Sequence, residues 1–455
     1  MSGSQASALA TPDPPTAAPL RPRFAASATT TYAANVGAAV LSLANVLLTA
    51  RLLGPSGRGQ VALVATIATV TSTVALLGVE QATVNIAGRE PRHRPALATN
   101  ALLIALLAGG VLSGALALLT AVAPGITGGL APSLVAIALA VVPLLGARTY
   151  LQALAEADYR FAWANGTRLL APLLAVILNA AMAVAGALTV GTAVAAWVLG
   201  QVVVVAALAW FVVRRSVGFG RPDPGLARRA LGFGVKSHLG RVMNVGNYRL
   251  DQWLVGALVG PGELGRYSVA VALSETLFFL PTSLASAQRP DLVRATPASA
   301  AQRAARVFRA AVIMTIAPAV ALIALAPAVC GRLFGAGFAG SADDLRILCL
   351  GAFGVVAVKL LGDALIAQRR PLLATAATGL GLVVTVALDL ALIPRHGGLG
   401  AAIASLLAYT AAGATAGLLF LRALGGRGGD LVPRPRDIEP VGREALVLLR
   451  AVVRR

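Results

Sequence analysis

The sequence predicts an all-α polytopic membrane protein with about 12 transmembrane helices in two parallel six-helix repeats. Of its 455 residues, 57% are hydrophobic and 12% are charged, whereas a soluble domain has roughly 25% charged residues. Apolar runs of roughly 20 residues, the length that crosses a ~30 Å hydrocarbon core, recur along the chain. Similar segments also return about two hundred residues apart.

Twelve apolar segments account for the expected helices, and their connections are mostly short, so neighbouring helices are antiparallel. The segments cover about 31–53, 60–87, 99–123, 131–155, 168–189, 191–213, 232–258, 265–287, 307–331, 345–367, 371–394 and 399–421.

The charge distribution predicts the orientation of the chain. The formal net charge is +20, but the arginines lie between apolar runs and in the tail, with no aromatic-interleaved basic patch, so nucleic acid is not an expected partner. The loops after the second, sixth, eighth and tenth helices hold Arg89, Arg92, Arg94, Arg214, Arg215, Arg221, Arg228, Arg229, Arg289, Arg294, Arg303, Arg306, Arg369 and Arg370. Because positive loops stay inside, both termini are expected to be cytoplasmic, with the protein in the cell membrane.

This topology divides the chain into five parts. Residues 1–28 form a disordered cytoplasmic lead, 29–215 an N-lobe, 216–231 a basic cytoplasmic linker, 232–422 a C-lobe and 423–455 a basic cytoplasmic tail. The end of the tail can form a short helix with apolar and arginine faces, which suits an anionic inner leaflet. A frayed, solvated tail is an equally good interpretation.

The internal repeat relates the two lobes. Aligning Gly54-Pro55 with Gly260-Pro261 also aligns Gly59 with Gly265. In nearly the same register, Asn45 corresponds to Asp251 and Asn179 to Asp389. Six helices return the chain to the same side of the membrane, so the halves are parallel, as in secondary transporters whose substrate path lies between repeats.

The seventh helix carries more charge than a lipid-facing helix tolerates. Arg241, Arg249 and Asp251 cost roughly 8–10 kcal/mol on insertion scales, whereas the apolar residues around them return about 2.5–5 kcal/mol. This helix must therefore line water or pair inside the bundle. Inter-helix locks in an occluded bundle are the structural alternative for each charge.

The buried polar residues predict a site for an anionic, phosphate-bearing substrate. The candidate substrate-binding residues are Lys236, His238, Arg241, Asn244, Arg249, Asn45 and Arg148. The candidate ion-coupling residues, for a proton or a sodium ion, are Asp251, Glu275, Glu80 and Asp363. Lys359 and Asp363 are four residues apart and could pair, while Lys236 and His238 could instead reach headgroups at the cytoplasmic end.

Other signals favour structural roles. Cys330 and Cys349 are expected to be buried free thiols, although a bridge is the alternative. Ser341 and Asp344 form a Ser-x-x-Asp sequence that predicts a helix capping box. The sequence holds no phosphate-binding, dinucleotide-binding, nucleophile-elbow or zinc motif, so we expect no catalytic site, cofactor or metal.

Three segments carry a family resemblance: ARLLGPSGRGQVALVATIATV at 50–70, RLDQWLVGALVGPGELGRYSVAVALSE at 249–275 and GRLFGAGFAGSADDLRILCLGAF at 331–353. They resemble the polysaccharide-transporter branch of the multidrug/oligosaccharidyl-lipid/polysaccharide flippase superfamily, which includes O-antigen flippases. The resemblance implies a V of two lobes with alternating access, and Asp251 matches the family's acidic residue on the seventh helix. Lipid II flippases of the superfamily usually have two extra helices, so a peptidoglycan role is less expected.

The resemblance implies export of a polyprenyl-pyrophosphate-linked oligosaccharide for surface polysaccharide assembly. Expected partners are this lipid-linked substrate, membrane lipids, a coupling proton or sodium ion and polysaccharide assembly enzymes. A drug/cation antiporter of the same fold is the first alternative, although a cavity weighted toward Lys and Arg would repel cations. A membrane polysaccharide polymerase or ligase is the second, and the short external loops argue against it.

Overall fold

The computed structural model describes residues 22–158, 160–216 and 218–434. Within these ranges the chain forms helices and contains no β-strand, as the sequence predicts. Nine described segments are long and apolar enough to cross a membrane. Two of them, α1 (Pro22–Ala75) and α13 (Pro371–Leu424), each join two expected spans across a non-helical glycine. α8 (Pro224–Leu258), which is too polar to be counted among the nine, supplies the remaining span.

The other helices follow the expected order. The N-lobe continues with α2 (Val79–Arg89), α3 (Arg94–Val122), α4 (Pro132–Ala140), α5 (Val142–Ala157), α6 (Phe161–Val184) and α7 (Val190–Arg215). The C-lobe contains α9 (Pro261–Ser274), α10 (Phe279–Arg294), α11 (Pro297–Pro327) and α12 (Ser341–Ala367). Short 3-10 or π turns cover Pro91–His93, Pro124–Thr127, Glu275–Phe278, Ala328–Leu333, Ala336–Phe338 and Gly428–Leu431.

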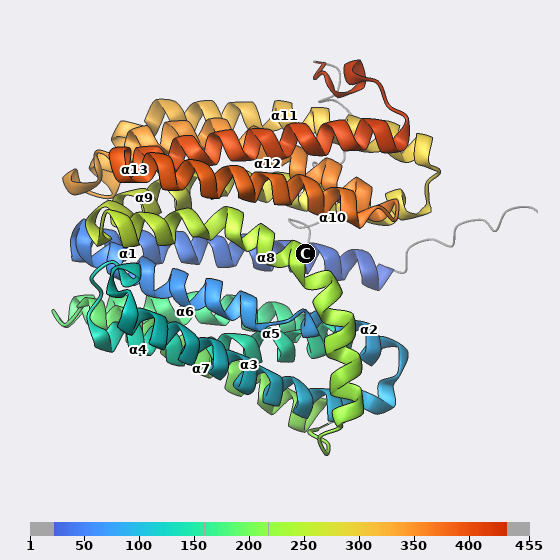
Figure 1. Cartoon of the computed structure of the whole chain (residues 1–455), viewed down its shortest axis with the longest axis horizontal. Coiled ribbons are helices and arrows are strands. Elements are labelled where there is room, and N and C mark those ends of the chain that lie inside the picture. The colour runs from blue at the N-terminus through green and yellow to red at the C-terminus, as the bar shows by residue number, and fades with distance from the viewer. Residues whose placement is uncertain (1–21, 159, 217, 435–455) are drawn as a thin grey trace, which may run out of the picture.

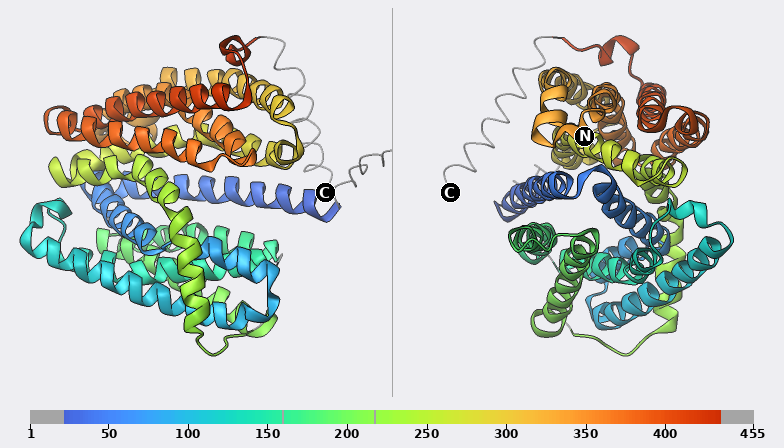
Figure 2. Two further views of the ribbon diagram at one scale, coloured as in Figure 1. Left: turned by 45° about the vertical axis from the view of Figure 1, so that its right-hand side comes forward. Right: turned by 90° about the vertical axis from the view of Figure 1, so that its left-hand side faces the viewer.

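The two lobes form a V. Figure 1 shows α9–α13 as the upper bundle and α2–α7 as the lower bundle, close together at the left and diverging toward the right. The end-on view in Figure 2 separates the same two bundles, with α1 and α8 between them. The architecture is that of a polytopic helical membrane protein with two bundles, which confirms the predicted fold class.

The Gly-Pro sequences adopt the same role in both repeats. Gly54 (φ 68°) interrupts α1 directly before Pro55, and Gly260 (φ 113°) separates α8 from α9 directly before Pro261. Positive φ is accessible to glycine with little strain, and proline suits the first turn of the helix that follows. We call this end of the molecule, where both turns lie, the Gly-Pro end.

The lobes share one apolar core at the Gly-Pro end. Leu63 and Ile67 of α1 belong to the same buried cluster as Leu264 of α9, Phe338 and Ile393. At the opposite end, separate clusters fill the N-lobe and the C-lobe. The single shared core explains why the V is closed at the Gly-Pro end.

α8 connects the two lobes. Leu226 and Ala230, in its first turns, are buried in the N-lobe core, and a Cβ atom on Gly78 would overlap the backbone of Gly234. The second half of α8 instead packs on α13, where Asn247 donates a hydrogen bond to the Thr378 carbonyl group at 3.0 Å. Figure 1 shows the first half turning across the N-lobe beside α2.

Several helices differ from the expected boundaries. α8 begins at Pro224, inside the expected linker, because Asp223 caps it by accepting a hydrogen bond from Leu226 N at 3.0 Å. α11 begins at Pro297 rather than near residue 307, after the cap Thr296. The expected second helix is broken, since Leu77 and Gly78 have positive φ between α1 and α2. Apolar length alone misses helical turns that extend beyond the hydrocarbon layer.

The predicted capping box at Ser341 is wrong. Ser341 is the first residue of α12, and its hydroxyl group donates to the carbonyl oxygen of Arg266 at 2.8 Å instead of capping the helix.

The thiols of Cys330 and Cys349 are buried and unbridged. Helix α1 already begins at Pro22, within the expected lead, and the expected tail helix lies outside the described residues.

Candidate functional site

The N-lobe contains a cavity of about 860 Å³. Its walls come from α1, α2, α5, α6 and α7, and α8 closes one side with Phe233 and Arg241. Three predicted site residues meet here: Glu80 on α2, Arg148 on α5 and Arg241 on α8. Residues that are distant in the sequence therefore line one space.

The charges of the cavity are largely compensated. Arg148 Nη1 donates to Gln201 Oε1 at 2.6 Å, and Arg168 Nη2 lies 3.2 Å from Glu156 Oε1. Arg241 Nη1 lies 3.4 Å from Glu80 Oε1, an ion pair that joins α8 to the N-lobe. The Arg241 side chain is 41% exposed and the Glu80 side chain 8%, so Arg241 keeps guanidinium surface that a ligand can reach.

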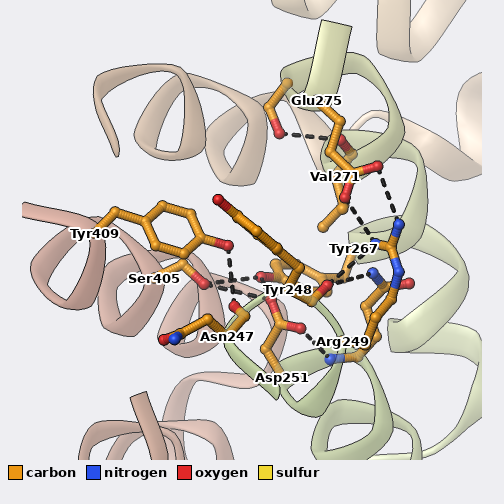
Figure 3. Close-up of polar contacts among 11 residues, drawn as sticks. Asn247, Tyr248, Arg249, Asp251, Tyr267, Val271, Glu275, Ser405 and Tyr409 are labelled. Atoms are coloured by element: carbon orange, nitrogen blue, oxygen red, sulfur yellow. Dashed lines mark hydrogen bonds and ion pairs between the residues drawn. The ribbon is translucent and has the colours of Figure 1, made fainter. Parts of the chain in front are cut away.

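The second cluster lies in the C-lobe (Figure 3). Arg249 and Glu275 form a two-point ion pair, with Nη1–Oε1 and Nη2–Oε2 distances of 2.7 and 3.3 Å. The guanidinium group thus neutralises a carboxylate from the next helical segment. Within the described residues Arg249 forms its ion pair with Glu275 and not with Asp251, in agreement with the spacing of Arg249 and Asp251 on the helix.

Asp251 is 1% exposed and fully engaged in hydrogen bonds. Its Oδ2 accepts from the Tyr267 hydroxyl at 2.6 Å and from Ser405 Oγ at 3.3 Å, and its Oδ1 accepts from Gln252 N at 2.7 Å. Figure 3 shows these groups converging from α8, α9 and α13. The arrangement stabilises a carboxylate in the middle of the bundle.

The repeat register places polar pairs at corresponding positions. In the N-lobe, Asn179 Nδ2 donates to Asn45 Oδ1 at 2.7 Å. In the C-lobe the corresponding residues are Asp251 and Asp389, both of them buried. Asp389 is 0% exposed, and neither of its carboxylate oxygens has a hydrogen-bond partner among the described residues. The C-lobe thus carries acid groups where the N-lobe carries a neutral amide pair.

The remaining predicted residues lie elsewhere. Lys236 is exposed and does not line the cavity, and Nε2 of buried His238 lies 3.3 Å from the Val74 carbonyl oxygen. Asn244 lines a small separate pocket in the C-lobe. Asp363 pairs with Arg289 rather than with Lys359, which lies over the Tyr248 ring at 5.9 Å.

Sequence reasoning missed several residues of these clusters. Arg168, Gln201 and Trp197 line the cavity, while Tyr267 and Ser405 bind Asp251. Arg168 could have been predicted as a site residue, because it is a charged residue at the beginning of an apolar run. Gln, Ser and Tyr residues are common in membrane helices, and their position near a charge depends on helix packing.

No metal cluster is evident in the parts of the chain that the structure covers. They hold no group of three or more His, Cys, Asp or Glu side chains that could bind a metal ion.

Comparisons with known proteins agree with the geometry. Lipid II flippase MurJ in an inward closed conformation matches with a TM-score of 0.65 and 14% identity, covering 93% of this chain and 92% of that chain. A multidrug resistance MATE family transporter of the MOP superfamily, inward-facing, has a TM-score of 0.60 and 16% identity over 87% and 94%. A MATE P26A mutant has a TM-score of 0.60 and 14% identity over 89% and 95%.

These structural matches establish the fold, and a sequence-family match establishes the family. No curated protein matches the chain at a significant level. The family model described as "Polysaccharide biosynthesis protein" matches residues 48–343, more than half of the chain. The match covers two of the segments that carried the resemblance in the sequence, 50–70 and 249–275, and the first part of the third, 331–353. The chain therefore belongs to the polysaccharide biosynthesis protein family.

Proposed function

We propose that this protein translocates a polyprenyl-pyrophosphate-linked oligosaccharide across the cytoplasmic membrane for cell-surface polysaccharide biosynthesis. The observation that carries the proposal is the 860 Å³ polar cavity inside a transporter fold, with Arg241 reaching into it from the helix that joins the lobes. Membership of the polysaccharide biosynthesis family and the likeness to a lipid II flippase support a lipid-linked glycan as cargo.

The arginine distribution supports an orientation. Arg92 and Arg94 between α2 and α3, Arg228 at the start of α8 and Arg303 at the start of α11 belong to the end opposite the Gly-Pro turns. Positive loops remain on the cytoplasmic side. We therefore assign the Gly-Pro end to the outer face and both termini to the cytoplasm, which gives an inward-facing state.

Arg241 is the residue that we assign to the pyrophosphate group. Arg249 is held by Glu275 through two contacts, and Arg168 is held by Glu156. Among the described residues Arg241 has a single ion pair, with Glu80 at 3.4 Å, and its side chain is partly exposed. A diphosphate can form the paired hydrogen bonds that this group offers, while the polyprenyl tail stays in the bilayer.

Asp251 is our candidate for the coupling ion, a proton or sodium. It is buried in the C-lobe, as is Asp389, its partner in the repeat register, and a carboxylate buried in a membrane bundle is a group that a proton or a cation can neutralise. Glu275 and Asp363 are less suited, because each is already paired with an arginine. Polysaccharide assembly enzymes remain expected partners on the basis of the cargo.

An antiporter of drugs or cations is the second candidate, favoured by the likeness to MATE transporters. The family match favours the glycan cargo instead. A membrane polymerase or ligase is the third, and the short connections at the Gly-Pro end leave little room for a catalytic domain.

The test is a lipid extract from cells that lack this protein. We expect a polyprenyl-linked oligosaccharide to accumulate and a surface polymer to be lost, with both restored by the wild-type chain and by Arg228→Gln, an exposed change on α8. Arg241→Gln should fail to restore them. An unchanged lipid pool with greater drug sensitivity would contradict the flippase and support the antiporter.

A further inference from the structure

We propose that the N-lobe cavity is a subsite for the uncharged saccharide part of the cargo, with Trp197 as its apolar wall and Glu80 as a hydrogen-bond acceptor. The proposal rests on the proposed function and deepens it. It separates the two parts of the headgroup, because the diphosphate stays at Arg241 and the sugar rings extend into the cavity beyond it.

The lining of the cavity has the chemistry of a hydroxyl-rich ligand. Uncharged side chains that can donate and accept hydrogen bonds are the largest group in it, among them Thr73, Asn85, Gln152 and Gln201. Such groups match sugar hydroxyls, which also donate and accept. The volume of about 860 Å³ is within the 300–1,000 Å³ range of ordinary ligand pockets.

The cations of the cavity leave little unbalanced positive charge for a second anion. Arg168 Nη1 donates to Asn35 Oδ1 at 3.0 Å in addition to its contact with Glu156. Arg148 donates to Gln201 at 2.6 Å. Two carboxylates accompany the three arginines of the lining, and Arg241 is already assigned to the diphosphate. The rest of the cavity therefore suits a neutral ligand.

Glu80 supplies the most specific observation. Its side chain lines the cavity and the residue is only 6% exposed. In the described part of the chain neither carboxylate oxygen accepts a hydrogen bond, and the ion pair of Oε1 with Arg241 at 3.4 Å leaves Oε2 available. A buried carboxylate that accepts no hydrogen bond is costly, and native structures rarely leave one in that state. A sugar hydroxyl or acetamido N–H group provides the missing donor from within the cavity.

Trp197 provides the complementary apolar surface. It lies on α7, four residues before Gln201, so both side chains lie on the same side of the helix and both line the cavity. The C–H face of a sugar ring can pack against the indole ring while the hydroxyls at the ring edge reach Gln201. This combination of an aromatic face and nearby amides distinguishes a sugar from a simple anion.

The experiment uses the purified full-length protein in detergent and saturation-transfer NMR, which detects weak binding. The probe is the lipid-free oligosaccharide released by mild acid from the polyprenyl-linked pool of the producing cells. Trp210→Leu is the matched control, because Trp210 lies on the same helix, is 47% exposed and does not line the cavity. We expect saturation transfer to the glycan with the wild-type protein and with this control.

Trp197→Leu and Glu80→Gln should each weaken glycan binding by about threefold or more, as expected for a lost aromatic or charge-assisted contact. Inorganic pyrophosphate at equal concentration should leave the glycan signal in place. The proposal is overturned if the wild-type protein gives no signal, if Trp197→Leu binds like Trp210→Leu, or if pyrophosphate displaces the glycan completely.

These outcomes are distinct from a failure of the proposed function. A protein that exports the lipid-linked oligosaccharide normally but fails the glycan test keeps its function and loses this subsite. If the lipid pool does not change in cells lacking the protein, the proposed function itself fails.

Discussion

Gly59 and Gly265 occupy equivalent positions in the two repeats, and each packs against the proline carbonyl group of the other repeat. A Cβ atom on Gly59 would overlap the carbonyl of Pro261, and one on Gly265 would overlap the carbonyl of Pro55. The two helices therefore approach as closely as backbones allow, which closes the Gly-Pro end.

Gly59→Ala should open this contact. The added methyl group has no space, and overpacking of this kind costs about 1–3 kcal/mol. We expect a shift toward the conformation that is open at the Gly-Pro end, measured as a longer spin-label distance between α1 and α9. Gly114→Ala on α3 is the control, because nothing lies within 4 Å of its Cβ position. An unchanged distance would show that the contact does not hold the lobes together.

Asp251→Asn should abolish transport without preventing membrane insertion. Asparagine retains the size and an oxygen that can accept from Tyr267, but it removes the charge that a coupling ion needs. We expect transport to fall by about tenfold or more, measured as restoration of surface polymer at matched expression. Asp291→Asn is the control, since the Asp291 side chain is 63% exposed. Normal transport by Asp251→Asn would remove this residue from ion coupling.

Asp389→Asn should stabilise the protein. Both carboxylate oxygens of Asp389 lack hydrogen-bond partners within the described residues, and the residue is 0% exposed. Replacing an ionisable group that is buried without hydrogen-bond partners relieves a desolvation cost of roughly 1–3 kcal/mol. Thermal unfolding in detergent at neutral pH should give a higher Tm, whereas Asp343→Asn, at a 68% exposed side chain, should change little. A lower Tm would mean that Asp389 has a partner that stabilises its charge.

Arg249→Met should destabilise the C-lobe more than the double change Arg249→Met with Glu275→Gln. The single change leaves Glu275 without its two-point partner inside the bundle. Because both side chains are about one-third exposed, we expect a loss of about 1–3 kcal/mol, between the values for exposed and buried pairs. A double-mutant cycle by thermal unfolding measures the coupling, and strict additivity would contradict the pair.

The sequence by itself determined the fold class, the two repeats and the register of their polar residues. Apolar length defines a membrane span, because unpaired backbone groups are too costly in lipid. The aligned Gly-Pro turns and the Asn45–Asp251 and Asn179–Asp389 correspondences needed only periodicity. The number of charges on α8 was sufficient to predict that this helix does not face lipid. Its packing against α13 and against Gly78 at the start of α2 agrees with that prediction.

The tertiary structure decided which charges meet. Arg249 could have faced any anion in the bundle, and only packing places it beside Glu275. Arg241 pairs with Glu80 although the two lie in different repeats, because the first half of α8 docks on the N-lobe. Helical periodicity tells which side chains share a face, but the neighbour of that face depends on how the lobes pack. For that reason the cavity and the position of the Glu80 carboxylate in its wall became visible only in three dimensions.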